Sequence, residues 1–217
     1  MGDRYFTYKT LSNEHILDKV RGVIHVGANY GQEREVYAHH HLSVLWFEPI
    51  PKVWKELNQN IKQLRDQWAY QFAVWDEDEQ VHFFHVTDNE GQSSSVLEFG
   101  KHTDLWPEVH HTETIYVCTV TLNSFFKSCP LSVHNFDFLV IDAQGAELHV
   151  LKGSDKILPR VKFVQVEATD CELYKGCAKL SEIDAFMRGQ GFKEIERTAF
   201  SPRPDIGQCY EVTYERI

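Results

Sequence analysis

The sequence has no apolar stretch long enough to cross a membrane, and its first residues, MGDRYFTYKTLSNEH, contain no signal-peptide core. Basic residues are in the minority: the chain has 22 Lys and Arg residues and 32 Asp and Glu residues, which gives a formal net charge of -10 at pH 7. A surface of that sign repels phosphate backbones, and no run of basic residues offsets it. We therefore expect a cytoplasmic protein that binds neither a membrane nor a nucleic acid.

Cysteine is also sparse. The chain has 5 cysteines and no CxxC pair. An odd count without paired spacing is typical of free thiols in a reducing compartment. Cys171 and Cys177 are near enough in sequence to form a disulfide or bind a metal, but their spacing matches no common zinc site. We predict no metal ligands.

What the chain does contain is a regular alternation of short apolar, β-branched runs and helical patterns. We expect strands at 22–26, 43–48, 69–74, 136–142 and 161–167, and helices at 32–41, 51–66, 146–152 and 181–190. Strands buried on both faces and separated by helices form parallel sheets. The prediction is an α/β fold in one domain over residues 1–217, with a helical segment at 1–21.

Two regions break this alternation. Segments 80–86 and 114–120 look like strands on either side of a polar stretch, so we expect residues 80–120 to form a strand extension and a cap over one sheet edge. At the end of the chain, segments 192–198 and 208–217 are separated only by residues 199–207, AFSPRPDIG. A parallel crossover needs a dozen or more residues, so these two strands must form an antiparallel hairpin.

A glycine turn follows the first strand. The dinucleotide fingerprint GxGxxG, counted from Gly27, fails because the chain has Asn29 and Gln32 where glycines are needed. Gly27 and Gly31 remain, and such a turn suits a carboxylate, a ribose, a phosphate or no ligand at all. Glu48 ends the second strand about 20 residues later, where an acid commonly accepts both ribose hydroxyls. Together they indicate a nucleoside, without separating NAD from S-adenosylmethionine.

A second motif, VIDAQGAELHVLKG, spans residues 140–153. Asp142 ends a buried strand, Glu147 lies in the first turn of the next helix, and Glu167 ends the neighbouring strand. Ligands of open α/β sheets bind outside these strand ends. The alternatives are structural: Asp142 as a helix N-cap and Glu147 as a complement to the helix dipole. Asp142 and Glu167 are also weighed as ligands of a divalent cation.

These motifs carry a family resemblance. Four segments in order resemble the FkbM family of S-adenosylmethionine-dependent methyltransferases: VIHVGANYGQE, LWFEPIP, FLVIDAQGAELHVLKG and VEATDCELYKG. The resemblance runs from about Gly22 to Phe192. It implies a Rossmann-like class I methyltransferase fold, with a mostly parallel seven-stranded sheet ending in the antiparallel hairpin. The chain departs from the family at His25 and Asn123, where Asp is common, and at Val140, where Lys is common.

The resemblance implies S-adenosylmethionine as methyl donor. The cofactor-binding residues expected from the motifs and the family are His25, Gly27, Ala28, Asn29, Gly31, Glu48, Pro49, Ala73, Val74, Ser94 and Asp142. An alcohol acceptor must also lose its proton. Asp142 is the first candidate for that step, followed by Glu147 and Glu167.

The expected acceptor is a hydroxyl on a small molecule, such as a sugar or a secondary metabolite. The aromatic and histidine residues of the cap (Phe99, His102, Trp106 and His110) fit a polar, ring-shaped ligand. His110 and His111 are alternatively an acceptor-side base or solvated loop residues. Two other functions remain open from the sequence: a nicotinamide-dependent oxidoreductase, and a non-catalytic binding module on the same fold.

Overall fold

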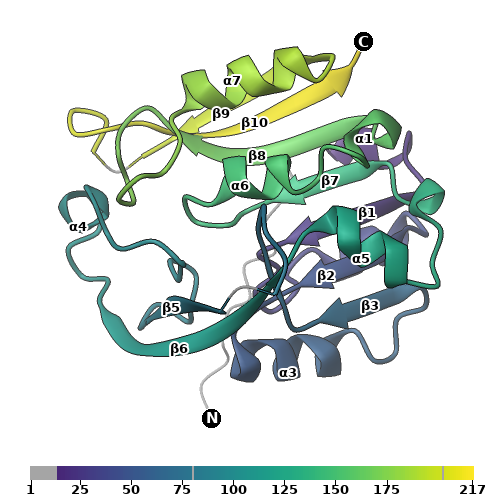
Figure 1. The fold of residues 1–217 in the computed structure, drawn as a ribbon, viewed down its shortest axis with the longest axis horizontal. Coiled ribbons are helices and arrows are strands. Elements are labelled where there is room, and N and C mark those ends of the chain that lie inside the picture. The colour runs from purple at the N-terminus through teal and green to yellow at the C-terminus, as the bar shows by residue number, and fades with distance from the viewer. Residues whose placement is uncertain (1–13, 80, 202) are drawn as a thin grey trace.

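A computed structural model describes residues 14–79, 81–201 and 203–217. Its centre is a seven-stranded sheet with the order β3-β2-β1-β7-β8-β10-β9 (Figure 1). The strands are β1 (Gly22–Val26), β2 (Ser43–Phe47), β3 (Gln67–Tyr70), β7 (Phe138–Ile141), β8 (Phe163–Thr169), β9 (Phe192–Phe200) and β10 (Cys209–Arg216). Neighbouring pairs from β3 to β8 are parallel. All five therefore end at the same edge of the sheet.

The terminal hairpin is confirmed. β10 pairs antiparallel with both β8 and β9, so the last strand of the chain is inserted between them. This strand order, with one reversed strand second from the edge, is that of the class I methyltransferase fold. The predicted fold class is confirmed in its mostly parallel sheet, its seven strands and its antiparallel end.

Helices cover both faces of the sheet. Ile24 and Val26 of β1 pack in a core with α5 (Leu122–Ser128), α6 (Glu147–Lys152) and α7 (Leu180–Gly189). Val23, in the same strand, packs on the other face with α1 (Glu14–Leu17), α2 (Arg34–His39) and α3 (Pro51–Asn60). Successive side chains of a strand point to opposite faces, so a strand that is buried at every position contributes to both cores. Two 3₁₀ turns, η1 (Val133–Asn135) and η2 (Leu158–Arg160), precede β7 and β8.

A smaller sheet lies beside the main one. It has the order β4-β6-β5 and consists of β4 (Ala73–Val74), β5 (Val81–Thr87) and β6 (His111–Val120). We call the connection between β5 and β6, residues 88–110, the cap; it contains α4 (His102–Leu105). Figure 1 shows β5, β6 and α4 at the end of the molecule toward which the parallel strands point. Residues 81–120 thus form two paired strands with the cap between them.

Three features differ from the prediction by more than a small shift of bounds. The strand expected at 69–74 is two strands, because β3 pairs with β2 whereas β4 leaves the sheet and pairs with β6. The helix expected at 51–66 ends at Asn60. The helix α5 was not predicted; it begins after Thr121, whose side chain accepts a hydrogen bond from the backbone N–H of Ser124 at 3.0 Å. Of the helical segment expected at 1–21, residues 1–13 lie outside the described ranges, and in the described part, 14–21, the helix α1 ends at Leu17.

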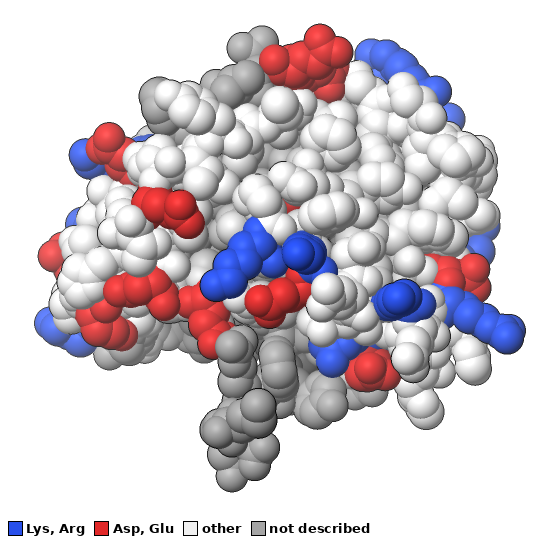
Figure 2. Space-filling model, turned by 90° about the horizontal axis from the view of Figure 1, so that it is seen from below, with Lys and Arg blue, Asp and Glu red and all other residues white. Residues whose placement is uncertain are grey.

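The charged surface is mixed. On the face seen in Figure 2, basic and acidic side chains lie next to one another, and the described atoms show no broad field of one sign. None of the helices in the described ranges combines the length and apolar content that spanning a bilayer requires. All five cysteines are free thiols.

Candidate active site

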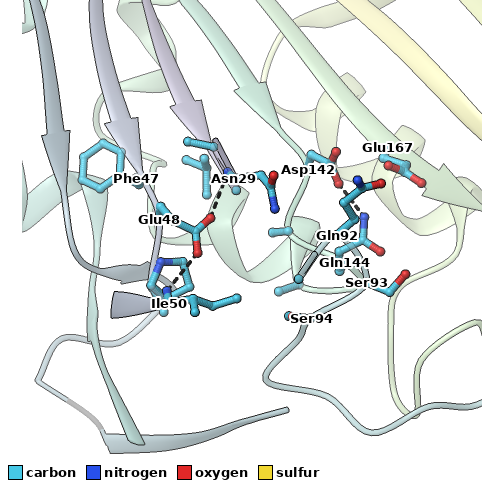
Figure 3. Close-up of a pocket in the computed structure, with 18 of the residues that line it drawn as sticks. Asn29, Phe47, Glu48, Ile50, Gln92, Ser93, Ser94, Asp142, Gln144 and Glu167 are labelled. Carbon is cyan, nitrogen blue, oxygen red and sulfur yellow. Dashed lines mark hydrogen bonds between the residues drawn. The ribbon is translucent and has the colours of Figure 1, made fainter. Parts of the chain in front are cut away.

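A cavity of about 510 Å³ opens at the carboxyl ends of the parallel strands. Its lining comes from the turn after β1, the end of β2, the start of β4, the cap, the loop after β7 and the end of β8. Figure 3 shows two groups of polar side chains facing this space: Glu48 with Asn29 on one side, and Asp142, Gln144 and Glu167 on the other.

The turn after β1 requires its first glycine. Gly27 has φ +78°, and a Cβ added there would lie 1.7 Å from the carbonyl oxygen of Asp142. The backbone N–H groups of Gly27 and Ala28 both donate to the carbonyl oxygen of Phe47, each at 3.0 Å. Asn29 also takes a positive φ, 45°, which Asn tolerates better than most residues. This turn therefore draws the ends of β1, β2 and β7 together around the cavity.

Glu48 is a buried carboxyl group at this end. It is 4% exposed and lines the cavity. Its Oε2 accepts the backbone N–H of Asn29 at 2.9 Å and its Oε1 accepts that of Ile50 at 2.8 Å. Burial raises the pKa of Glu48 to about 7, against the lowering effect of these two hydrogen bonds. Each carboxylate oxygen has a second lone pair, so the group can still accept hydrogen bonds from a ligand.

Asp142 occupies the other end, after β7. Its Oδ1 accepts a hydrogen bond from Nε2 of Gln144 at 2.6 Å, and the hydroxyl of Tyr174 donates to Oε1 of Gln144 at 2.6 Å. Gln144 stands at φ +50°, so a strained loop holds this chain of contacts. Asp142 does not cap the next helix: α6 begins at Glu147, and its N-cap residue, Ala146, has no side-chain cap. Glu167, two residues before β8 ends, lines the same cavity.

Glu147 is not brought to this cavity. It is buried, and its Oε1 accepts the backbone N–H groups of Ala143 at 3.1 Å and Gly145 at 3.0 Å. Burial raises the pKa of Glu147 to about 7. The side chain therefore binds the loop that carries Gln144, and the geometry does not support the predicted catalytic role for Glu147.

Of the remaining predicted residues, some line the cavity and others lie outside it. Those that line the cavity are His25, Ala28, Pro49, Ala73, Val74 and Ser94. Gly31 does not line it; a Cβ there would lie 2.6 Å from a methyl group of Leu57, so this glycine permits α3 to pack closely. His110 and His111 also lie outside the lining. His110 is bound to Asp88, with Nδ1 and Oδ2 3.3 Å apart.

Sequence reasoning overlooked two residues of the Asp142 end. Gln144 and Tyr174 stand within the motifs DAQG and ELYKG, but nothing in their spacing shows that they bond to each other. Within the described ranges, no three His, Cys, Asp or Glu side chains gather closely enough to hold a metal ion.

Comparison with known proteins agrees with this architecture. The chain is 25% identical over 169 residues to the 2-O-methyltransferase NoeI of Sinorhizobium fredii, covering 74% of this chain and 68% of that protein. Its fold is similar to the tRNA (m1A22) methyltransferase candidate Sp1610 of Streptococcus pneumoniae (TM-score 0.51, 8% identity, 93% of this chain and 68% of that one). It also resembles the METTL16 methyltransferase domain (TM-score 0.52, 10% identity, 94% and 65%).

The two structures share too little sequence with this chain to show more than the fold. The family comparison is more specific, because the model of the Methyltransferase FkbM domain matches residues 25–194. That range runs from β1 into β9 and contains both polar ends of the cavity. The chain belongs to the FkbM methyltransferase family.

Proposed function

We propose that this protein transfers a methyl group from S-adenosylmethionine to a hydroxyl group of a small molecule. The observation that carries the proposal is the arrangement of one cavity with two polar ends, Glu48 at the end of β2 and Asp142 after β7. The end at Glu48 suits a nucleoside, and the end at Asp142 suits an acceptor that must lose a proton.

The Glu48 end fits the donor. A volume of about 510 Å³ lies within the usual range of small-molecule sites. Glu48 would accept the ribose hydroxyls, Ala73 and Val74 offer apolar contact to the adenine, and the turn at Gly27 lets a ligand approach the backbone. When bound, S-adenosylmethionine supplies a methyl group that is already activated for displacement. The protein's own task is then to orient the acceptor and to take its proton.

Asp142 is the group proposed for the proton. Gln144 donates to Oδ1 of Asp142 and so restrains the carboxylate, and a carboxylate oxygen can accept more than one hydrogen bond, including one from an acceptor hydroxyl. Glu167 lies near the end of the adjacent strand and is the second carboxylate that could orient the acceptor. The 2-O-methyltransferase NoeI, which is similar in sequence, supports oxygen as the methylated atom.

The proposal is tested by separating donor binding from transfer. Calorimetry should show that S-adenosylhomocysteine binds and that NAD does not. Asp142→Asn keeps the size of the side chain but removes its basicity. This variant should bind S-adenosylhomocysteine as well as the wild type and lose transfer by roughly a hundredfold or more, the usual contribution of a general base. Asp104→Asn, at an exposed position of α4, is the matched control.

Two results would contradict this function. If NAD binds and S-adenosylhomocysteine does not, the protein uses a nicotinamide cofactor. If Asp142→Asn transfers methyl groups at the wild-type rate, the proton is taken elsewhere and the assignment of Asp142 is wrong.

A further inference from the structure

Four rings cluster where the cap meets the loop after β8. The His102 ring stacks on Phe99 at 4.1 Å between centroids, and it lies 5.0 Å from the ring of Trp106 and 5.5 Å from that of Tyr174. His102 and Trp106 both line the main cavity. These two side chains form an aromatic wall of the cavity.

His102 carries an unpaired polar atom. The residue is 1% exposed, and its Nδ1 has no hydrogen-bond partner. Buried polar atoms in proteins are nearly always paired, so an orphan beside a cavity indicates a partner that comes from outside the chain. Burial lowers the pKa of His102 to about 4, aided by the charge of His111 and opposed by Glu108. The imidazole is therefore neutral near pH 7.

A neutral imidazole nitrogen selects its partner. Depending on the tautomer it donates or accepts one hydrogen bond, and a hydroxyl group can do either. An anion is disfavoured by the charges around the same cavity. Its lining includes five carboxyl residues and, among the described residues, no Lys or Arg; the five are Glu33, Glu48, Glu90, Asp142 and Glu167. An acceptor bearing phosphate or carboxylate would meet repulsion here.

The wall also adjoins the proposed site of proton transfer. Tyr174, which contacts the His102 ring, donates its hydroxyl to Gln144, and Gln144 in turn donates to Asp142. A ligand held at His102 is thus next to the residues that orient this carboxylate. The indole of Trp106 adds a broad apolar surface on which the C–H face of a saturated ring can pack.

We propose that His102 and Trp106 form the acceptor subsite, and that it takes an uncharged polyhydroxylated ring, one of whose hydroxyls bonds to Nδ1 of His102. The inference rests on the proposed function and adds to it the class of acceptor. It excludes sugar phosphates, nucleotide sugars and uronic acids as acceptors.

The test measures binding as well as turnover. With the protein saturated by S-adenosylhomocysteine, methyl hexosides and their 6-phosphates are titrated and followed by ligand-observed NMR. Neutral hexosides should bind at least tenfold more tightly than the matching phosphates. His102→Phe keeps the stacked ring but removes the nitrogen, and should weaken hexoside binding about tenfold. His110→Phe, the same change outside the cavity lining, should leave it unchanged.

Donor affinity and thermal unfolding are measured on the same variants. His102→Phe should bind S-adenosylhomocysteine within twofold of the wild type and melt no lower, because it removes an unpaired buried atom. If it fails to fold, His102→Gln is used instead; it keeps a hydrogen-bonding group and should retain part of the hexoside affinity.

Three outcomes would overturn the subsite while leaving the proposed function intact: S-adenosylhomocysteine binds but no hexoside does, the phosphates bind as tightly as the hexosides, or His102→Phe binds hexosides like the wild type. If the wild type does not bind S-adenosylhomocysteine at all, the proposed function fails and the subsite with it.

Discussion

Donor affinity should depend on pH through the buried carboxyl group of Glu48. Its pKa is raised to about 7 by burial, so its charge changes across the neutral range. The ionised form has lone pairs on both oxygens beyond those used by the N–H groups of Asn29 and Ile50. A protonated carboxyl group offers fewer acceptors to two ribose hydroxyls. The proton and the donor should therefore compete.

The size of the effect follows from that pKa. With a pKa of about 7, roughly a tenth of the Glu48 groups are ionised at pH 6 and roughly nine tenths at pH 8. The apparent dissociation constant is the intrinsic one divided by the competent fraction. Affinity for S-adenosylhomocysteine should thus rise about tenfold from pH 6 to pH 8. Glu48→Gln should bind more weakly at pH 8 and show no such rise.

The assay is calorimetry with S-adenosylhomocysteine at pH 6, 7 and 8 and constant ionic strength. Glu90→Gln removes an exposed carboxyl group from the lining of the same cavity and is the matched control, which should retain the rise. The reasoning fails if wild-type affinity is flat over this range. It also fails if Glu48→Gln keeps the wild-type slope, because another group would then be titrating.

Three further variants probe the support of the cavity. Gly27→Ala combines φ +78° with a Cβ placed 1.7 Å from a backbone oxygen, so urea unfolding should show that the free energy of unfolding falls by roughly 3 kcal/mol or more. Gly176→Ala is the control, because Gly176 has a similar φ of +76° but open space around it. Its free energy of unfolding should fall by only about 1 kcal/mol. Tyr174→Phe removes the hydroxyl that donates a hydrogen bond to Gln144, and it should slow methyl transfer without changing the affinity for S-adenosylhomocysteine. An unchanged rate would show that this hydroxyl does not contribute to transfer. The pKa of Glu147 rises on folding from 4.5 to about 7, so its contribution to stability is lost as the pH rises from about 4.5 to about 7, by about 3 kcal/mol. Glu147→Gln should make that part of the stability curve less steep, with the slope due to Glu48 remaining, and a curve with the full wild-type slope would place the titration elsewhere.

The sheet was predictable because its signals are local. β1 consists mainly of Val and Ile, and all of its positions are buried, as is typical of a central parallel strand. The hairpin of β9 and β10 followed from the short connection between them alone. The antiparallel pairing of these two strands could therefore be predicted from the sequence without knowledge of their contacts.

The split between β3 and β4 was not predictable in the same way. Residues 69–74 contain no Gly or Pro to mark a break, and the pattern reads as one strand. The break exists because Ala73 and Val74 pair with Thr119 and Val120, which lie far along the chain. Propensity describes the segment, but tertiary pairing decides where it goes.

Some residues of the site could likewise be predicted from the sequence, and others could not. Gly27, Glu48 and Asp142 could be placed because each ends a strand, and strand ends of a parallel sheet share one edge. The acid in the first turn of α6 could not be assigned, since such an acid can face a ligand or bind nearby backbone N–H groups. Glu147 does the latter, at Ala143 and Gly145. The choice depends on the loop conformation, which no local pattern specifies.

His25 stands where the family often has an acid, and the structure gives a physical reason for the difference. Its ring stacks on Trp46, its register partner on β2, at 4.9 Å, and its Nδ1 lies 3.2 Å from the hydroxyl of Tyr37. Burial raises the pKa of Tyr37 well above its usual value, so this hydroxyl stays protonated. A carboxylate at position 25 would lose the ring contact and bring a charge into a site that is 5% exposed. His25, which precedes the turn at Gly27, therefore packs against Trp46 and Tyr37, partners that only the folded chain brings together.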